Sequence, residues 1–128
     1  MAAGVAVVFS LLTVVEGSLV LLGISQPDYV VLQPLLIYNV IMGVIGLVAG
    51  AALWLNRRWA LTLAIIIGTA HVIVLLVVGT MYLSGEAVAL HSVRAMTVRS
   101  VIWLAIVWMA WMARRAETPR QATPEGQR

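Results

Sequence analysis

The segment "AALWLNRRWALTLA" (residues 51–64) places a pair of arginines, Arg57 and Arg58, between two apolar runs. The runs extend outward from this pair over residues 35–55 and 59–83. Each has the ~20 residues that a helix rising ~1.5 Å per residue needs to cross ~30 Å of hydrocarbon. Because the connection between them is so short, we expect two membrane-spanning helices that pack as antiparallel neighbours.

Two more apolar runs of similar length, residues 2–24 and about 90–113, flank this pair. Hydrophobic residues make up 62% of the chain and charged residues 10%, whereas soluble domains average roughly 45–50% and about 25%. The first run has no basic segment before it and exceeds the roughly 7–15 apolar residues of a signal peptide, so we interpret it as a retained helix. The sequence therefore predicts an all-α integral membrane protein, a compact antiparallel bundle of four transmembrane helices within residues 1–115, followed by a mobile cytoplasmic tail at 116–128.

The distribution of arginine predicts the topology. Arg57 and Arg58 lie in one connection and Arg114 and Arg115 begin the basic C-terminal segment, while the other two connections contain acids but no Lys or Arg. The positive-inside rule then places both termini and the Arg57 connection in the cytoplasm, and we expect a multi-pass protein of the bacterial inner membrane. We assign the net charge of +3 to topology and lipid headgroups, and we expect no nucleic-acid partner.

The connection after the first helix contains Ser25, Gln26, Pro27 and Asp28. This order is typical of a capping box with proline in the first turn. It predicts a second helix that begins near Ser25 in the outer interface and bends at Pro34 before it crosses the membrane.

Several classes of chemistry find no support in the sequence. The absence of cysteine excludes disulfides, thiolate metal sites and Cys-linked haem. Axial haem ligation by His71 and His91 would join residues whose depths differ by roughly 16 Å, which argues against a haem or metal centre. No nucleophile with a base, paired carboxylates, glycine-rich phosphate loop or HExxH motif stands out. The sequence identifies no cofactor, and a protein that is not an enzyme is the favoured interpretation.

Glu16 is the one acid within the apolar segment "TVVEGSLVLL" (residues 13–22). A charge at the bilayer centre costs at least ~2.5–3.5 kcal/mol on insertion scales, so it normally faces the bundle interior and finds a partner. We expect an ion pair between Glu16 and Arg94 or Arg99 of the fourth helix. All four predicted helices place a polar residue in the outer half or centre of the membrane, and the candidate ligand-binding residues are Glu16, Asn39, His71, Tyr82, His91, Arg94 and Arg99.

Two arginines against one glutamate leave a spare positive charge and a planar donor fork. This favours a site for a small polar or anionic amphiphile, such as a lipid headgroup or a quinone. A structural alternative is that the cluster is a polar lock that fixes which helix lies beside which.

Gly43, Gly46 and Gly50 share one face of the second helix with Asn39, and Gly68 lies on a face of the third. Faces without side chains let a neighbouring backbone approach closely, so these glycines are expected to serve helix packing. If the face points into the bundle, it favours the ligand-binding hypothesis. If it points outward, it favours an accessory or structural subunit of a larger membrane complex, or a homo-oligomer.

The segment "AVVFSLLTVVEGSLVLLG" (residues 6–23) resembles in outline the first helix of the small multidrug resistance exporters. The resemblance implies proton-coupled transport of a small molecule through Glu16. It covers that helix alone, since no "AYAxWxG"-like segment follows, and this chain carries a membrane histidine and two arginines in its fourth helix.

Overall fold

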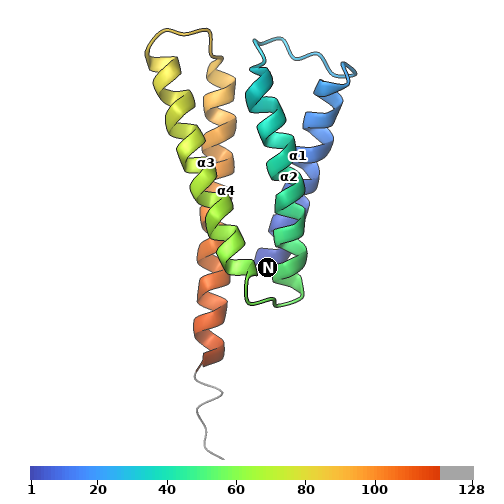
Figure 1. Cartoon of the computed structure of the whole chain (residues 1–128), viewed down its shortest axis with the longest axis vertical. Coiled ribbons are helices and arrows are strands. Elements are labelled where there is room, and N and C mark those ends of the chain that lie inside the picture. The colour runs from blue at the N-terminus through green and yellow to red at the C-terminus, as the bar shows by residue number, and fades with distance from the viewer. Residues whose placement is uncertain (119–128) are drawn as a thin grey trace, which may run out of the picture.

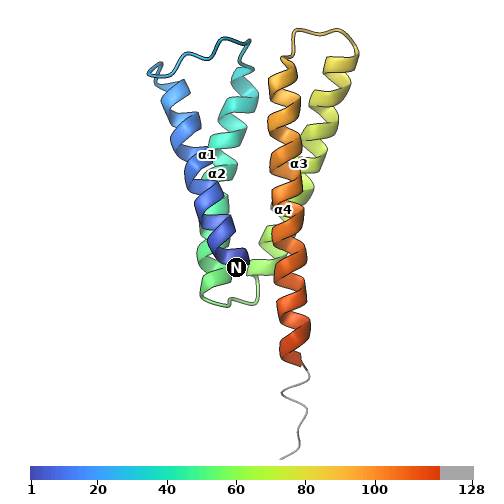
Figure 2. The same cartoon turned by 180° about the vertical axis from the view of Figure 1, so that it is seen from behind.

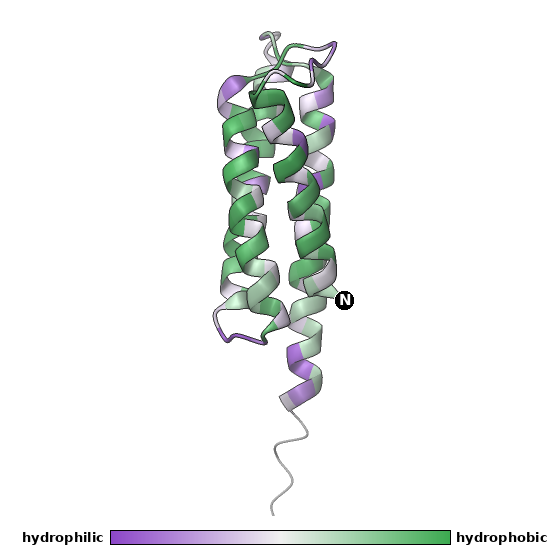
Figure 3. Ribbon diagram, turned by 90° about the vertical axis from the view of Figure 1, so that its right-hand side faces the viewer, coloured by the Kyte–Doolittle hydropathy of each residue, from purple (hydrophilic) through white to green (hydrophobic). Residues whose placement is uncertain are grey.

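A computed structural model describes residues 1–118 of the chain. The described residues form four helices: α1 (Ala2–Leu21), α2 (Gln33–Trp54), α3 (Ala60–Leu83) and α4 (Leu90–Glu117). Each is long and apolar enough to cross a membrane. Hydrophobic residues cover most of the helices, and hydrophilic residues lie in the α2–α3 loop, at the C-terminal end of α4, and at several positions in the opposite half of the bundle and its loops (Figure 3). The prediction of an all-α multi-pass membrane protein with a compact four-helix bundle is confirmed.

The bundle consists of two antiparallel hairpins. The closest packing is between α1 and α2 and between α3 and α4, and the contacts of α2 with α3 and of α1 with α4 join the hairpins. α1 and α4 are close together near the α2–α3 loop and diverge toward the other two loops, whereas α2 stays near the second hairpin at that end, where Leu35 packs against Val78 and Met96 (Figures 1 and 2). Nη2 of Arg114 donates hydrogen bonds of 2.9 Å to the carbonyl oxygens of Arg57 and Arg58. These bonds connect α4 to the α2–α3 loop, at what we call the closed end of the bundle.

The glycine face of α2 points into the bundle, against α1. A Cβ atom on Gly43 or Gly50 would approach side chains of α1 closer than carbon atoms pack, and one on Gly46 would overlap Ser10 and Trp103. Around Gly68 the nearest atoms lie 3.8 Å from a built Cβ, which is ordinary van der Waals contact. The close packing of α1 on α2 therefore requires glycine at these positions of α2. The packing around Gly68 of α3 is looser.

Small and apolar residues fill the half of the bundle near the α2–α3 loop. This cluster consists of Ala6, Ala49, Ala64, Ile67, Trp103 and Ile106. A second cluster, nearer the other end, packs Leu35 of α2 against Val78, Val88 and Met96. The interior of this half is mainly apolar, and the buried hydroxyl of Ser10 lies beside Gly46 and Trp103 without a hydrogen-bond partner among residues 1–118.

Three helices end in the same hydrogen-bonded turn. In α1, the Gly23 amide donates to Val20 O and the Ile24 amide to Leu19 O, and Gly23 has φ 71°. This is the Schellman pattern, which requires a left-handed residue just past the helix. Asn56 (φ 52°) and Gly85 (φ 76°) occupy the same position after α2 and α3. The first helix therefore ends at Leu21, three residues before the predicted boundary at residue 24.

The predicted helix start at Ser25 is wrong. Residues 22–32 form an irregular loop, and α2 begins at Gln33 with Pro34 in its first turn. A first-turn amide has no acceptor within the helix, so proline fits there without the predicted bend. At the other end of the chain α4 continues to Glu117. The rest of the predicted mobile tail, residues 119–128, lies outside the described residues.

Candidate functional site

A pocket of about 320 Å³ opens at the end of the bundle where α1 and α4 diverge. Its walls come from the last turns of α1, the α1–α2 loop, the first turns of α2 and the first half of α4. Ligand pockets in proteins typically measure ~300–1,000 Å³, so this pocket has room for a small ligand. It lies between the hairpins, and α3 contributes no residue to its lining.

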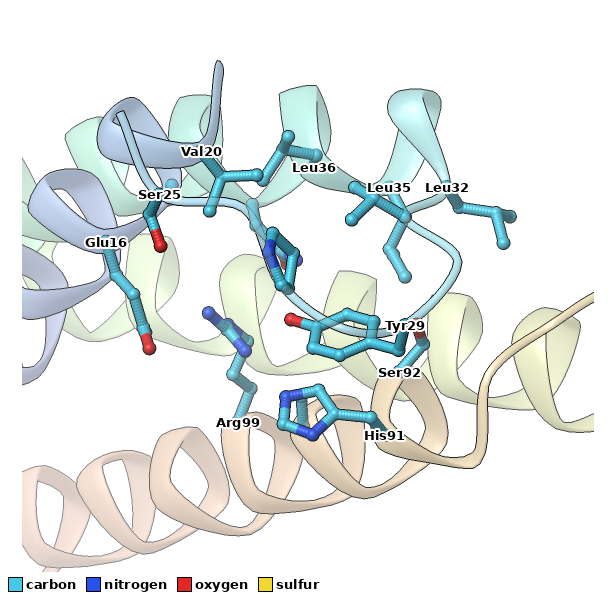
Figure 4. Close-up of a pocket in the computed structure, with 15 residues that line it drawn as sticks. Glu16, Val20, Ser25, Tyr29, Leu32, Leu35, Leu36, His91, Ser92 and Arg99 are labelled. Carbon is cyan, nitrogen blue, oxygen red and sulfur yellow. The ribbon is translucent and has the colours of Figure 1, made fainter. Parts of the chain in front are cut away.

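Four of the seven predicted ligand-binding residues line this pocket: Glu16, Asn39, His91 and Arg99. Glu16 and His91 are exposed and form its rim, whereas Asn39 and Arg99 are half-buried and lie deeper. Three helices from both hairpins therefore bring polar groups to one space (Figure 4).

The other three candidates do not line the pocket. Arg94 is exposed and lies five residues before Arg99 on α4, so at ~100° per residue it faces another direction. Tyr82 is 39% exposed, near the end of α3. His71 is 3% exposed and lies in the interior between α2, α3 and α4.

The expected ion pair between Glu16 and the arginines of α4 is absent from the described residues. Glu16 and Arg99 both point into the pocket (Figure 4), and the buried Nε atom of Arg99 has no hydrogen-bond partner in residues 1–118. The reason is the arrangement of the hairpins: α1 and α4 stand on opposite sides of the pocket, which separates the carboxylate from the guanidinium. The pocket therefore holds two opposite charges that do not neutralise each other by contact.

Tyr29 of the α1–α2 loop stacks on His91 of the first turn of α4. Their ring centroids are 4.2 Å apart and the rings are inclined by 23°. The hydroxyl of Tyr29 points toward the guanidinium of Arg99 (Figure 4). The stack connects the loop of one hairpin to the other hairpin, and both residues line the pocket. Sequence reasoning missed Tyr29, because an irregular loop carries no periodicity that assigns a direction to a side chain.

A hydrogen-bonded pair lies beneath the pocket and connects the hairpins. The hydroxyl of Tyr38 on α2 lies 2.7 Å from Nδ1 of His71 on α3, and the edge of the His71 ring faces Trp103 at a centroid distance of 6.3 Å. Sequence reasoning missed Tyr38. A usable signal was available, because a histidine inside a membrane bundle needs a polar partner and Tyr38 adjoins the candidate Asn39.

A small cavity of about 10 Å³ adjoins this pair and is lined by Ser10, Asn39, His71 and Trp103 among others. One water molecule requires roughly 10–15 Å³, so nothing larger fits. Asn39 lines both this cavity and the larger pocket. It therefore marks the boundary between the ligand-sized space and the packed interior, and His71 lies on the interior side.

No group of three or more His, Cys, Asp or Glu residues within the described part of the chain could hold a metal ion. The polar groups of the pocket are instead one carboxylate, one guanidinium, an amide, an imidazole, a phenol and two serine hydroxyls, the last from Ser25 and Ser92. This set suits ionic and hydrogen-bonded contacts with an organic ligand.

The fold and the pocket together define a multi-pass membrane protein of four helices with a polar site between its two hairpins. No protein-family model, curated protein or solved structure matches the chain.

Proposed function

We propose that this protein binds a small amphiphile, with its polar head in the pocket between the hairpins and its apolar part against the aliphatic wall. One observation supports this above the others: Glu16, Asn39 and Arg99, from three different helices, converge on a pocket of about 320 Å³. The wall beside them contains Val20, Leu32, Leu35 and Leu36. A few placed polar groups in a mainly apolar concavity are typical of small-molecule sites.

The proposed orientation follows from the arginines. The α2–α3 loop and the end of α4 carry Arg57, Arg58, Arg114 and Arg115. By the positive-inside rule this end is cytoplasmic in a bacterial inner membrane, and both termini are on the same side. The pocket is at the opposite end, so it is accessible to molecules of the outer leaflet.

The direction of the glycine face favours binding over an accessory role. Gly43, Gly46 and Gly50 are used inside the chain, against α1. That face is therefore not available for docking on a larger membrane protein.

The packed half of the bundle favours binding over transport. Below the pocket, the cluster that includes Ala49, Ala64, Ile67 and Trp103 packs the middle of the bundle. It separates the pocket from a second pocket of about 350 Å³ at the α2–α3 loop end, which is lined by Leu53 and Arg114 among others. A substrate path through Glu16 would require the hairpins to separate along this cluster.

Native mass spectrometry of the protein, released from its own membrane in a mild detergent, tests the proposal. We expect a reproducible added mass of small-molecule size that is lost in Arg99→Gln and retained in Arg94→Gln. The second variant is the matched control, since it removes the same charge from the same helix outside the pocket. A bare monomer or homo-oligomer mass in the wild type would contradict the proposal, and a foreign subunit would support the accessory role instead.

A further inference from the structure

We infer that the head of this amphiphile is zwitterionic, with an ammonium group and a phosphate a few bonds apart, as in a phosphoethanolamine lipid. The inference rests on the proposed function and narrows the class of ligand. In the structure Glu16 and Arg99 line the pocket and Arg94 does not, although the sequence analysis placed all three in one cluster.

The positive and negative charges that line the pocket are equal in number. The sequence suggested two arginines against one glutamate, which would favour an anion. The structure leaves Arg94 outside, so the formal charges that line the pocket are one carboxylate, Glu16, and one guanidinium, Arg99. The pocket therefore has no excess positive charge that would favour an anionic ligand.

The charges of Glu16 and Arg99 are separated from each other in the pocket. Glu16 and Arg99 face the same space (Figure 4) but form no ion pair within residues 1–118. A charge in a low-dielectric environment needs a counter-charge or hydrogen bonds. A purely anionic head would compensate Arg99 and be repelled by Glu16, and a purely cationic head would do the reverse. A zwitterion compensates both groups at once.

The depths of the two groups match the order of charges in a lipid. Glu16 lies five residues before the end of α1, and Arg99 lies nine residues after the start of α4. Because α1 ends below the level at which α4 begins (Figure 2), Arg99 is deeper than Glu16 by less than the roughly 6 Å that the helical rise gives for this difference. In a phosphoethanolamine lipid of the outer leaflet the phosphate lies deeper than the ammonium. The phosphate would thus meet Arg99 and the ammonium Glu16, with the acyl chains directed toward the membrane centre.

The chemistry of each group fits its assigned partner. The planar guanidinium of Arg99 offers a donor fork that matches phosphate oxygens, and its buried Nε is an unpartnered donor among the described residues. The carboxylate of Glu16 only accepts hydrogen bonds when ionised, which suits an ammonium donor. Leu35 and Leu36, close to Asn39 on α2, provide apolar contact for the first part of the acyl chains.

The test compares two lipids with the same acyl chains, phosphatidylethanolamine and phosphatidylglycerol, titrated into the delipidated protein and followed by native mass spectrometry. We expect wild-type protein to prefer phosphatidylethanolamine by about tenfold, a ratio that corresponds to ~1.4 kcal/mol. Glu16→Gln should abolish this preference, and Arg99→Gln should weaken the binding of both lipids. Glu16→Asp, which keeps the carboxylate, should retain the preference.

Two matched controls lie outside the pocket. Glu86→Gln removes an exposed carboxylate from the α3–α4 loop at the same end of the bundle, and Arg94→Gln removes an exposed guanidinium from α4. Both should behave as the wild type. Loss of the Glu16 charge makes α1 more apolar, so insertion should not suffer, and a thermal unfolding curve for each variant checks its folding. Glu16→Leu serves as a second uncharged variant.

The outcomes separate the two proposals. If delipidated wild-type protein binds neither lipid, the proposed function fails. If it binds both and Glu16→Gln keeps the same lipid preference as Glu86→Gln, the zwitterionic head is wrong while the binding site stands. A parallel titration with glycerophosphoethanolamine, which carries the head without acyl chains, shows whether the ligand is a lipid or a free headgroup. Affinity equal to that of the lipid would overturn the lipid as ligand.

Discussion

Tyr29 and His91 stack with ring centroids 4.2 Å apart, which makes a loop residue of the first hairpin a direct contact of the second hairpin at its outer end. At this end α1 diverges from α4 (Figure 1), although Leu35 of α2 still packs against Val78 and Met96 of the second hairpin. The stack therefore restrains the α1–α2 loop, which lacks regular hydrogen bonding over residues 26–31.

Tyr29→Ala should loosen this loop without unfolding the bundle. Aromatic pairs contribute about 0.5–1.5 kcal/mol beyond their buried area, so the backbone order parameters of residues 26–32, measured by NMR, should fall. His91→Phe should keep them high because it keeps an aromatic ring. Tyr82→Ala, which removes an exposed tyrosine from α3, is the control and should leave the loop unchanged. Equal order parameters in all variants would show that the stack does not hold the loop.

Gly46→Ala should destabilise the bundle. A Cβ at this position overlaps Ser10 Oγ and the ring of Trp103, and overpacking of a well-packed interior typically costs about 1–3 kcal/mol. Gly79→Ala is the matched control, because a Cβ there meets nothing within 4 Å. It should show only the gain of about 0.5–1 kcal/mol that alanine has over glycine inside a helix. Unfolding titrations in detergent micelles measure both free energies. A Gly46→Ala protein as stable as Gly79→Ala would argue that the α1–α2 contact is looser than the structure has it.

Much of the fold was predictable because it follows from local properties. Apolar length alone sets the number of spans, and a short connection alone makes neighbouring spans antiparallel. The helix ends were less accessible. Gly23 and Asn56 stop their helices through a left-handed turn, so α1 ends before the apolar Ile24. The capping pattern at Ser25 starts no helix, because α2 begins at Gln33.

The site was predictable only as far as depth and helix face define it. Glu16, Asn39 and Arg99 could be placed in one half of the membrane by counting residues, and they line one pocket. Which arginine enters it depends on the rotation of α4. Whether Glu16 meets that arginine depends on how far the hairpins stand apart. Periodicity within one helix encodes neither the rotation of α4 nor the distance between the hairpins. The sequence analysis therefore expected an ion pair that is absent from residues 1–118, and this prediction was wrong.

Tyr38→Phe should destabilise the contact between the hairpins. It removes the hydroxyl that lies 2.7 Å from Nδ1 of His71 and leaves that buried nitrogen without this partner. An unsatisfied buried polar group typically costs about 1–3 kcal/mol, which unfolding titrations can resolve. Tyr82→Phe, at an exposed tyrosine, should have no measurable effect. If Tyr38→Phe is equally silent, the bond does not contribute to stability.

The proposed topology leads to a last prediction, which the absence of cysteine in the chain makes simple to test. Glu86→Cys introduces a thiol in the α3–α4 loop, and Thr118→Cys introduces one just past α4, and both positions are exposed. In intact cells a membrane-impermeant maleimide should label the first variant and not the second, because arginines flank the α4 end and hold it in the cytoplasm. After the membrane is permeabilised, both should react, which confirms that each thiol is accessible. The reverse pattern in intact cells would place the pocket at the cytoplasmic face, and the ligand would then have to come from the inner leaflet.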